Sequence, residues 1–435
     1  MAIITRKIKG TEDVLPSDSY KWQFVEDIMR KEASVFGYKE IRTPVFEHTE
    51  LFSRGVGETT DVVQKEMYTF STKGDDSITL RPEGTAGAAR AFLEHGLYND
   101  GLPIKAYYFT SCYRYEKPQA GRQREFHQFG LEIFGTAAPS ADAELISIGK
   151  AIFDRLNIKN LQLEINSIGC PTCRAEYQKA LIEYFNQYKE ELCPTCLARL
   201  ERNPMRLLDC KSPVCSKIAE SAPTVLEYIC NDCKVHFEAV KKYLDSLKIE
   251  YKINPKIVRG LDYYTRTVFE FVSQDIGAQG TVCGGGRYDG LIEELGGTHT
   301  PSLGFGLGME RLLLLMEKQG IEIPLPPSCD IYIAGLGEQA ELKAFDLIKQ
   351  IRQSSLIAEG DIAGKGLKAQ MKYADKIKAK FSMVIGDEEL IKNEATMKNM
   401  QTGEKTTVRL DEQFFSDFFA AYIENDSKSL LDMIK

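Results

Sequence analysis

The chain has 435 residues, 43% of them hydrophobic and 27% charged, and a formal net charge of −8. This composition is typical of a globular protein of two or three domains, and the negative charge disfavours a protein that coats nucleic acid without specificity. No apolar run approaches the roughly 18 residues of a membrane span, and the N-terminus lacks the apolar core of a secretory signal, so we expect a cytoplasmic protein with no membrane partner.

The first elements in the chain are a long helix and a short strand. Residues 17–36 carry apolar side chains at helical spacing, and Gly37 follows them as a stop signal. Residues 41–45 read as a strand that contains Pro44. Proline removes a donor from the ladder, so we expect this strand at a sheet edge or at a contact between subunits.

A β-hairpin with a long polar tip follows. Residues 106–115 and 126–134 are aromatic and rich in strand formers, and residues 116–125 between them are charged. On the returning strand, alternate side chains share one face, which is made of Phe126, Gln128, Gly130 and Glu132. That face offers an aromatic plate, an amide, a gap and a carboxylate, and a gap flanked by polar groups would admit a small polar ligand.

The middle of the chain predicts a sheet that is interrupted by an inserted domain. A helix over 141–156 and a strand over 161–165 precede the interruption, and strands resume at 264–272. The segment between them is mostly helical in pattern and has its own composition. We therefore expect, in chain order, core residues 1–169, an inserted domain 170–240 and core residues 241–322.

The last quarter of the chain predicts a separate α/β domain over 328–435. Prolines within 324–327 mark a linker, and the strands 330–335 and 381–386 then alternate with helical segments. Four lysines are spaced to share one face of a predicted helix: Lys365, Lys368, Lys372 and Lys376. A stripe that contacts phosphates and a merely solvated stripe both fit this spacing.

Eight of the eleven cysteines form four close pairs in the inserted segment: Cys170/Cys173, Cys193/Cys196, Cys210/Cys215 and Cys230/Cys233. In a reducing cytosol, tight pairs of this kind indicate thiolate ligands of a structural zinc ion. Two four-cysteine sites would use all eight thiols. One site with spare thiols, a site in which His236 replaces a thiol, and free buried or redox thiols also fit the sequence.

The most informative motif is the dodecamer from Arg259 to Glu270. It opens with an arginine and an aspartate, sets Tyr263 beside Tyr264, and continues as a strand. An arginine at the strand entrance supplies a permanent cation, and successive rings face opposite sides of the strand. These parts suit a small ligand with a negative group and a polar ring, although an ordinary amphipathic strand with a charged cap has the same pattern.

Further polar residues gather on two turns. Arg114 and the loop residue Arg122 offer planar, always charged donors that suit phosphate oxygens. Glu83 and Thr85 are two positions apart, so their carboxylate and hydroxyl can point the same way and bind an ammonium group. An ordinary surface turn has the same pattern of residues. The glycines of 304–308 do not fit a dinucleotide fingerprint and no P-loop occurs, so arginines would have to hold any nucleotide.

Taken jointly, these motifs resemble those of the histidyl-tRNA synthetases, a family of class II aminoacyl-tRNA synthetases. The hairpin with Arg114 resembles motif 2 of that class, and the glycine-rich strand that enters a helix at Glu310 resembles motif 3. Pro44 after the long helix resembles motif 1, a dimer element. Residues 259–264 and 284–288 resemble the two signature segments of the family. The cysteine pairs depart from the family pattern.

The resemblance implies an α+β fold: a catalytic core on an antiparallel sheet flanked by helices, with a small Cys-rich insertion and a C-terminal α/β anticodon-binding domain. It implies a homodimer that activates L-histidine with ATP and Mg²⁺, forms histidyl-adenylate and pyrophosphate, and transfers histidine to the 3′ end of its tRNA.

The resemblance also implies a role for each site residue. The α-ammonium of histidine would bind Glu83, Thr85 and Gln128, and its imidazole would bind Glu132 and Tyr264, with Tyr263 completing the histidine site. The phosphates of ATP would be bound by Arg114, Arg122 and Arg311. Phe126 would stack on the adenine, and Glu116 would help to place the nucleotide. Arg259 would stabilise the α-phosphate during attack by the histidine carboxylate.

Two other classes of protein fit part of the sequence. A non-catalytic histidine sensor related to the synthetases would be expected to lose ATP-binding arginines or the C-terminal domain, and neither is lost here. A zinc-dependent nucleic-acid-binding protein would leave the arginine and glycine segments unexplained. A histidine-dependent exchange assay between ATP and pyrophosphate separates these hypotheses.

Overall fold

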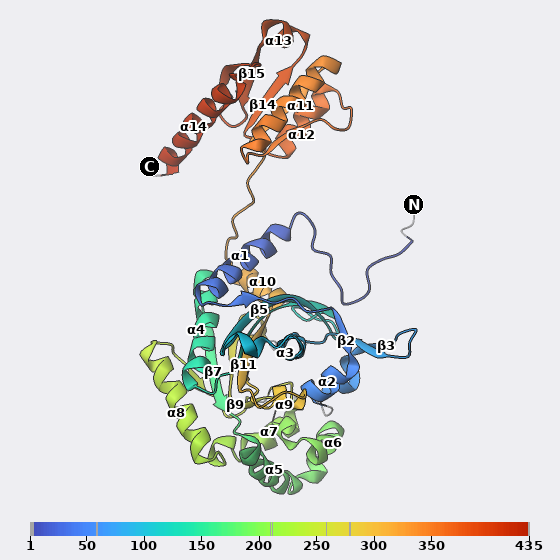
Figure 1. The fold of residues 1–435 in the computed structure, drawn as a ribbon, viewed down its shortest axis with the longest axis vertical. Helices are drawn as coiled ribbons and strands as arrows, with labels where there is room; N and C mark the ends of the chain where they lie inside the picture. Colours follow the sequence, from blue (N-terminus) through green and yellow to red (C-terminus); the bar gives the residue numbers. More distant parts are fainter. Residues whose placement is uncertain are drawn as a thin grey trace. The chain divides into compact units, whose positions relative to one another are not determined.

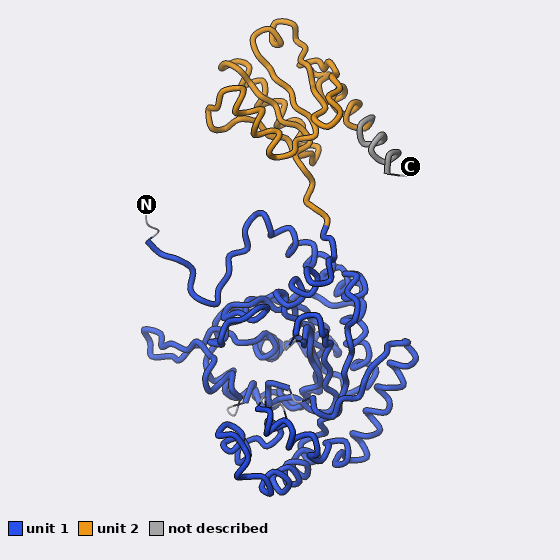
Figure 2. Tube along the Cα trace, turned by 180° about the vertical axis from the view of Figure 1, so that it is seen from behind, with its two compact units in different colours: residues 1–323 blue, residues 324–435 orange. Residues whose placement is uncertain are grey.

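The computed structural model describes residues 4–57, 60–208, 210, 212–257, 259–277 and 280–433. The chain divides into two compact units, 1–323 and 324–435, coloured separately in Figure 2. This division falls at the predicted proline linker. The finer boundaries at residues 170 and 240 remain predictions.

The larger unit is built on an eight-stranded, mostly antiparallel sheet (Figure 1). Its strands lie in the order β1 (Lys39–Glu40), β5 (Ile104–Tyr113), β6 (Glu125–Phe134), β11 (Ser302–Gly308), β10 (Thr281–Arg287), β9 (Thr265–Ser273), β7 (Leu161–Ser167) and β8 (Lys252–Ile253). The edge pairs β1–β5 and β7–β8 are parallel. Because β11 and β10 continue the sheet beside the predicted β5–β6 hairpin, segments far apart in sequence share one face.

Helices cover this sheet on both faces. Four helices enclose the main core with Phe129, Leu131 and Ile133 of β6: α1 (Ser19–Val35), α4 (Pro139–Arg155), α8 (Asn231–Ser246) and α10 (Met309–Lys318). On the other face, α3 (Thr85–Glu94) and α9 (Leu291–Glu294) pack with Tyr108 and Phe134. Strand alternation therefore sends the odd-numbered side chains of β6 into the main core and leaves the even-numbered ones on the opposite face.

A small antiparallel sheet lies between β1 and the hairpin in the chain. Its strands pair in the order β2 (Phe46–His48), β4 (Ser77–Leu80) and β3 (Tyr68–Ser71). The helix α2 (Thr49–Val56) and a π-helical turn (Val62–Glu66) connect β2 to β3, and a 3₁₀ turn (Leu97–Asp100) precedes β5.

The predicted strand over 41–45 is wrong, because this segment joins β1 to β2 without being a strand. The guanidinium of Arg81 gives the reason: its Nη1 donates to the carbonyl oxygens of Thr43, at 2.8 Å, and Pro44, at 3.0 Å. A side chain therefore takes acceptors that a neighbouring strand would need. The expected edge position does apply to the flanking strands, since β1 and β2 each lie at the edge of their sheet.

The Cys-rich segment is helical, as predicted. It contains α5 (Pro171–Asn186), α6 (Pro194–Arg202), α7 (Pro213–Glu220) and the start of α8, joined by 3₁₀ turns at Lys189–Glu191, Pro204–Leu207 and Val225–Glu227. Helix α8 runs beyond residue 240 and buries Phe237, Val240 and Leu244 in the main core. The segment is therefore anchored to the sheet at its C-terminal end.

The smaller unit is an α/β sandwich around a mixed sheet. Its strands lie in the order β13 (Ala358–Gly360), β12 (Ile331–Gly335), β14 (Phe381–Ile385), β15 (Glu394–Asn399) and β16 (Lys405–Arg409), and the first three are parallel. The helices are α11 (Glu338–Gln353), α12 (Leu367–Lys376), α13 (Asp387–Lys392) and α14 (Phe414–Met433). The predicted α+β class with a C-terminal α/β unit is confirmed.

The predicted lysine stripe is shorter than expected. Lys368, Lys372 and Lys376 are exposed on α12, but Lys365 lies ahead of the helix, whose N-cap is Gly366. The side-chain amide of Gln370 donates to the carbonyl of Lys365 at 2.7 Å, which holds that residue in the preceding loop.

Across the described part of both units, no helix is both long and apolar enough to span a bilayer.

Candidate active site

The predicted site residues gather around two adjoining cavities in the larger unit. The larger cavity, of about 590 Å³, is lined by Glu83, Thr85, Arg114, Arg122, Gln128, Arg259, Tyr263 and Tyr264. The smaller, of about 180 Å³, is lined by Arg114, Glu116, Arg122, Phe126, Gln128, Arg259 and Arg311. Because several residues line both, the two cavities form one site. Of the twelve predicted histidine and ATP residues, only Glu132 lines neither cavity, since it is fully buried.

Two glycines of β11 let polar side chains of β6 lie flat across the sheet. A Cβ atom on Gly304 would lie 1.8 Å from Oε2 of Glu132, and one on Gly306 would lie 1.9 Å from Nε2 of Gln128. A larger residue at either position would displace the polar group above it. The glycine-rich strand therefore shapes the site by close approach and not by binding a dinucleotide.

Glu132 is the centre of a buried hydroxyl network. Its Oε1 accepts hydrogen bonds from Thr85 Oγ1, at 2.8 Å, and Tyr108 OH, at 2.9 Å. Its Oε2 accepts one from Tyr288 OH. Burial raises the pKa of Glu132 to about 8, although the three hydroxyl donors act in the opposite direction. This carboxyl therefore changes its charge near neutral pH.

Tyr108 and Tyr288 are site residues that the sequence analysis missed. The ring of Tyr108 lies over two glycines, because a Cβ on either Gly84 or Gly130 would lie 2.2 Å from a ring carbon. The gap predicted at Gly130 is thus filled by a tyrosine of the protein and does not admit a ligand. The cross-strand pairing of Tyr108 with Gly130 is the signal that would have identified this contact.

The turn before α3 is buried, so the surface-turn interpretation of Glu83 and Thr85 is wrong. Oε2 and Oε1 of Glu83 accept the backbone N–H groups of Thr85 and Ala86, each at 2.7 Å, and so cap the helix. Burial raises the pKa of Glu83 against these donors. The backbone N–H of Gly84 donates to Oε1 of Gln128 at 3.2 Å, which joins the turn to β6.

The adjacent tyrosines are both buried beside this network. The rings of Tyr263 and Tyr264 have centroids 4.7 Å apart, and the ring of Tyr263 lies 5.5 Å from that of Tyr288. The guanidinium carbon of Arg259 lies 5.6 Å from the centroid of Tyr264. The tyrosine pair therefore connects the carboxyl network to the first arginine of the site.

Arg259 is held across the sheet by a carboxylate and a glycine. Its Nη1 forms an ion pair with Glu270 of β9, and a Cβ on Gly284 would lie 2.7 Å from the guanidinium nitrogens. Burial acts to lower the pKa of Arg259, but the carboxylate of Glu270 raises it overall. The buried Nε of Arg259 has no hydrogen-bond partner among the described residues.

The remaining arginines are fixed by backbone carbonyls and by Glu116. Nε of Arg114 donates to Pro82 O at 2.8 Å, and its guanidinium carbon lies 5.3 Å from the centroid of Phe126. Arg122 forms an ion pair with Glu116, and Nη1 of Arg311 donates to the carbonyl of Thr281 at 2.7 Å.

These cations repel one another. Burial, together with the nearby charges of Arg122 and Arg114, lowers the pKa of Arg311 to about 10. An anion placed among the three guanidinium groups would remove this repulsion. The arrangement therefore suits a polyphosphate.

Glu310, at the start of α10, ties that helix to the hairpin. Its carboxylate accepts the backbone N–H of His127 at 2.9 Å and contacts the ring Nδ1 at 2.8 Å, which raises the pKa of His127. Glu310 also lines the smaller cavity together with Glu116. Carboxylate oxygens of this kind are the ligands that Mg²⁺ prefers.

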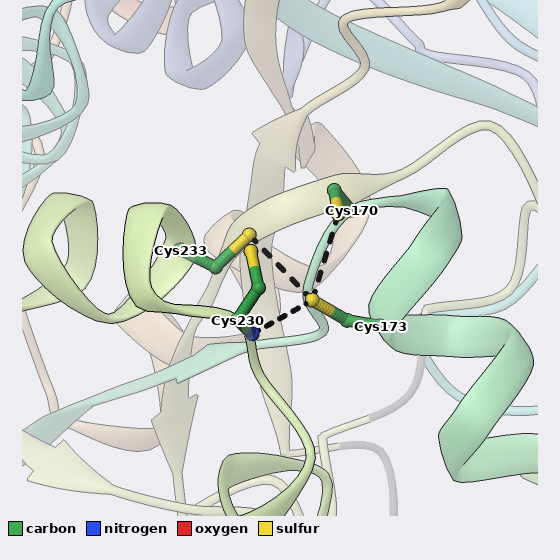
Figure 3. Close-up of side chains that lie close together, drawn as sticks. All are labelled: Cys170, Cys173, Cys230 and Cys233. Atoms are coloured by element: carbon green, nitrogen blue, oxygen red, sulfur yellow. Dashed lines mark hydrogen bonds between the residues drawn. The ribbon is translucent and has the colours of Figure 1, made fainter.

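The eight paired cysteines form two groups of four, and in each group the sulfur atoms all lie within 4.8 Å of one another. The first group contains Cys170, Cys173, Cys230 and Cys233 (Figure 3), and the second contains Cys193, Cys196, Cys210 and Cys215. His236 belongs to neither group, since its Nε2 lies 3.3 Å from Oδ1 of the buried Asp142. This grouping is the one that the two-site alternative requires.

Comparison with known proteins shows the family of the chain. A family model described as histidyl-tRNA synthetase matches residues 10–181 and 207–312, and one described as an anticodon binding domain matches residues 330–414. The chain is 57% identical over 410 residues to the histidine–tRNA ligase of Caldanaerobacter subterraneus subsp. tengcongensis, covering 94% of this chain and 98% of that protein.

Two further proteins extend this similarity. The histidine–tRNA ligase of Clostridium novyi is 58% identical over 403 residues, which cover 93% of this chain and 96% of that protein. The crystal structure of apo histidyl-tRNA synthetase from S. aureus is similar with a TM-score of 0.81 and 40% identity, covering 95% of this chain and 100% of that one. The chain belongs to the histidyl-tRNA synthetase family.

Proposed function

We propose that this protein is a histidine–tRNA ligase that activates L-histidine with ATP and transfers it to the 3′ end of its tRNA. The observation that carries the proposal is the single site in which a hydroxyl and carboxyl network adjoins a cluster of arginines. One end matches an imidazole amino acid and the other a triphosphate. Gln128 and Arg259, which line both cavities, mark where the two substrates would meet.

At the amino acid end, the turn before α3 and strand β6 supply the binding groups. Glu83, Thr85 and Gln128 would bind the α-ammonium. Glu132 and Tyr264 would bind the two imidazole nitrogens. Oε2 of Glu132 contacts one hydroxyl, that of Tyr288, and an oxygen of a carboxyl group can make a second hydrogen bond. An apolar amino acid of similar size would leave these buried polar groups unpaired, so such a site rejects it strongly.

At the nucleotide end, Arg114, Arg122 and Arg311 would bind the phosphates, and Phe126 would stack on the adenine. Mg²⁺, bound with ATP, would neutralise phosphate charge, and Glu116 and Glu310 are the carboxylates that line this cavity. Arg122 must exchange its ion pair with Glu116 for a phosphate, so ATP would reorganise this loop.

The first chemical step needs positioning and charge more than proton transfer. An oxygen of the histidine carboxylate, already anionic, attacks the α-phosphorus in line, and the bond to pyrophosphate breaks. Arg259 would stabilise the negative charge on the α-phosphoryl oxygens. In the second step a hydroxyl of the terminal adenosine of tRNA attacks the carbonyl carbon, and AMP leaves.

The C-terminal unit would bind the anticodon arm, and α12 offers a surface for it. Lys368, Lys372 and Lys376 are exposed at four-residue spacing, so their ammonium groups lie along one side of the helix. Replacing all three with glutamine should raise the KM for tRNA several-fold and weaken its dependence on salt. Histidine-dependent exchange, which needs no tRNA, should not change.

We also propose that the protein is a homodimer that works in the cytoplasm. Val45 and Phe46 beside Pro44 are exposed apolar side chains, at 41% and 54%, next to two sheet edges. Such a surface suits a subunit contact. Light scattering after gel filtration should give twice the chain mass of 49.0 kDa, and a single chain mass would contradict the dimer.

The decisive test of the activity is exchange of labelled pyrophosphate into ATP. Exchange should require histidine and Mg²⁺ and should not occur with other amino acids. A folded protein that binds histidine without exchange would instead be a histidine sensor, and one that binds neither histidine nor ATP would be a nucleic-acid-binding protein. Aminoacylation of tRNA with labelled histidine then tests the second step.

A further inference from the structure

Four cysteines from opposite ends of the Cys-rich segment converge on one point (Figure 3). Cys170 and Cys173 lie at the start of α5, and Cys230 and Cys233 lie at the start of α8. The Sγ atoms of Cys170 and Cys173 are 3.5 Å apart, and those of Cys173 and Cys233 are 3.9 Å apart. Residues 60 positions apart in sequence thus present thiols to the same space.

The second group of four lies inside the first along the chain. Cys193 and Cys196 start α6, Cys215 lies in α7, and Cys210 precedes α7. The Sγ atoms of Cys193 and Cys210 are 3.9 Å apart. The pairing is therefore nested: the first and last cysteine pairs form one group, and the two middle pairs form the other.

The spacing of these sulfur atoms fits a tetrahedral zinc ion. With zinc–sulfur bonds of about 2.3 Å, two sulfurs of a tetrahedron lie about 3.8 Å apart. The measured separations are 3.5 Å and 3.9 Å, whereas a disulfide requires about 2.05 Å. The thiols are all free, so eight potential thiolate ligands are present.

The surroundings also favour thiolates over neutral thiols. Cys170, Cys193 and Cys230 are N-caps of helices, where the helix dipole favours negative charge. Backbone N–H groups donate to sulfur as well: that of Cys230 lies 3.0 Å from Cys173 Sγ, and that of Cys193 lies 3.2 Å from Cys215 Sγ. Both groups have the donors that a tetrathiolate site needs.

We propose that the Cys-rich segment holds two zinc ions in separate four-thiolate sites, and that the second site positions the turn that carries Arg259. The first ion, bound by the group that contains Cys170, closes the base of the segment where it leaves and re-enters the sheet. The second, bound by the group that contains Cys193, fixes α6 and the following 3₁₀ turn. Both ions are structural, because four thiolates leave no open position for a substrate.

The link to the active site runs through side chains between the cysteines of the second group. Nη2 of Arg206 donates to the carbonyl of Gly260 at 2.9 Å, and its Nη1 donates to that of Arg259 at 3.3 Å. Nδ2 of Asn203 donates to Oδ1 of Asp262 at 3.0 Å. The backbone that presents Arg259 and leads into Tyr263 is thus held from the metal-bound module.

A second contact fixes the same module to the opposite wall of the site. Nη2 of Arg199, on α6, lies 2.7 Å from Oδ2 of Asp61. Cys193, Arg199, Arg206 and Cys210 all line the larger cavity. Loss of the second zinc would therefore release one wall of the site. This positioning role rests on the proposed function, but the two metal sites do not.

Metal content tests the sites without any measurement of activity. Elemental analysis of the full chain, purified under reducing conditions from cells grown with added zinc, should give two zinc ions per chain. The double variants C170S/C173S and C193S/C196S should each retain one, and Cys329→Ala in the C-terminal unit should retain two. The proposal would be overturned if the parent protein contained no zinc, if it contained iron in place of zinc, or if it contained only one zinc ion per chain.

Cobalt replacement keeps the test valid if a serine variant fails to fold. The parent protein, stripped of metal and refilled with Co²⁺, should bind two equivalents with the visible absorption of tetrahedral cobalt thiolates. Saturation at one equivalent, or binding without thiolate bands, would contradict two four-thiolate sites.

The positioning role is tested by Arg206, which touches no sulfur. Arg206→Ala should keep two zinc ions and its thermal stability, but its kcat for histidine-dependent exchange should fall about 10- to 100-fold. Arg206→Lys, which keeps a donor for the carbonyls of the turn, should recover part of this loss. Lys217→Ala, an exposed position of α7 in the same module, is the matched control and should retain full exchange.

The outcomes separate the two proposals. Full activity in Arg206→Ala would overturn the positioning role and leave the metal sites intact. Two zinc ions in a parent protein that shows no exchange would contradict the proposed function alone.

Discussion

The two ends of the active-site cavity differ in how their charged groups are paired. At one end, buried carboxyl groups accept hydrogen bonds from hydroxyl and backbone donors of the protein itself. At the other end, the charges of neighbouring arginines help to lower the pKa of Arg311. Glu132 accepts three hydroxyl groups, and Glu83 accepts two backbone N–H groups. The arginines instead share Glu116, Glu270 and a few carbonyl oxygens. The amino acid end is complete before substrate binds, and the phosphate end has excess positive charge.

This difference follows from where the residues lie. The carboxyl network comes from central strands and a helix N-terminus, which fix side chains tightly and suit discrimination among amino acids. Arg114 and Arg122 lie in the connection between β5 and β6, outside the strands. We therefore expect changes at the arginine end to affect the rate of chemistry, and changes at the carboxyl end to affect histidine affinity.

The largest effect is expected for Arg259→Ala. Arg259 lies where the two ends meet and keeps a buried Nε without a partner among the described residues. Loss of a group that stabilises transition-state charge typically costs about 10²–10³-fold in rate, so exchange should fall by about 10³-fold while histidine binding changes little. Pyrophosphate exchange and histidine calorimetry measure the two quantities.

Arg54→Ala serves as the control, because Arg54 is exposed on α2 and pairs with Glu50 one helical turn away. It should retain the parental rate. If Arg259→Ala also kept that rate, Arg259 would not belong to the mechanism, and the meeting point of the two ends would have to lie elsewhere.

A glycine substitution can move the same arginine without removing it. A Cβ at Gly284 would lie 2.7 Å from the guanidinium of Arg259, so Gly284→Ala should push that group off the sheet. A displacement of about 1 Å can cost about 10²-fold in rate, and kcat should therefore fall by about that factor. The KM for histidine should stay close to that of the parent. An unchanged kcat would show that the position of Arg259 is not critical.

Gly306→Ala is the matched change at the amino acid end. Its Cβ would meet the side-chain amide of Gln128, the end of a flexible side chain that can turn away, so the fold should be kept. Loss of one hydrogen bond to the ammonium should raise the KM for histidine about 10-fold, with little change in the KM for ATP. The opposite split, in which Gly306→Ala lowers kcat and Gly284→Ala raises the KM for histidine, would reverse our assignment of the two ends.

The sequence predicted those parts of the site that depend on strand alternation. Gln128 and Glu132 were placed on one face because side chains two apart on a strand point the same way, and this rule needs no knowledge of neighbouring strands. Tyr108 was missed because its position over Gly130 depends on the register between β5 and β6. A ten-residue charged tip, 116–125, does not fix that register.

Other errors also came from contacts between distant segments. The side chain of Arg81 takes the carbonyls that a strand over 41–45 would have used, and Arg81 lies far along the chain. The cysteine pairs were visible in the sequence, but their nested grouping depends on how α5 to α8 pack. Local patterns therefore predicted which residues matter, and tertiary packing decided which of them meet.

The smallest effect concerns the charge of Glu132. Its folded pKa of about 8 lies above its ordinary value of 4.5, so between these pH values the folded protein binds one proton more than the unfolded chain. The free energy of unfolding should therefore fall as pH rises toward 8, by about 1.4 kcal/mol per pH unit from this group. Glu132→Gln cannot titrate and should lose this part of the pH dependence.

The single tryptophan makes this measurement specific to the larger unit, because Trp22 lies on α1 and packs against His127. Its fluorescence reports the midpoint temperature of thermal unfolding. When the pH is raised from 6 to 8, this temperature should decrease by about 4 °C more in the parent than in Glu132→Gln. Glu250→Gln, an exposed change in the same unit, should follow the parent. Equal pH dependence in all three proteins would mean that Glu132 is already ionised in the folded state, and the contrast between the two ends of the cavity would then rest on hydrogen bonding alone.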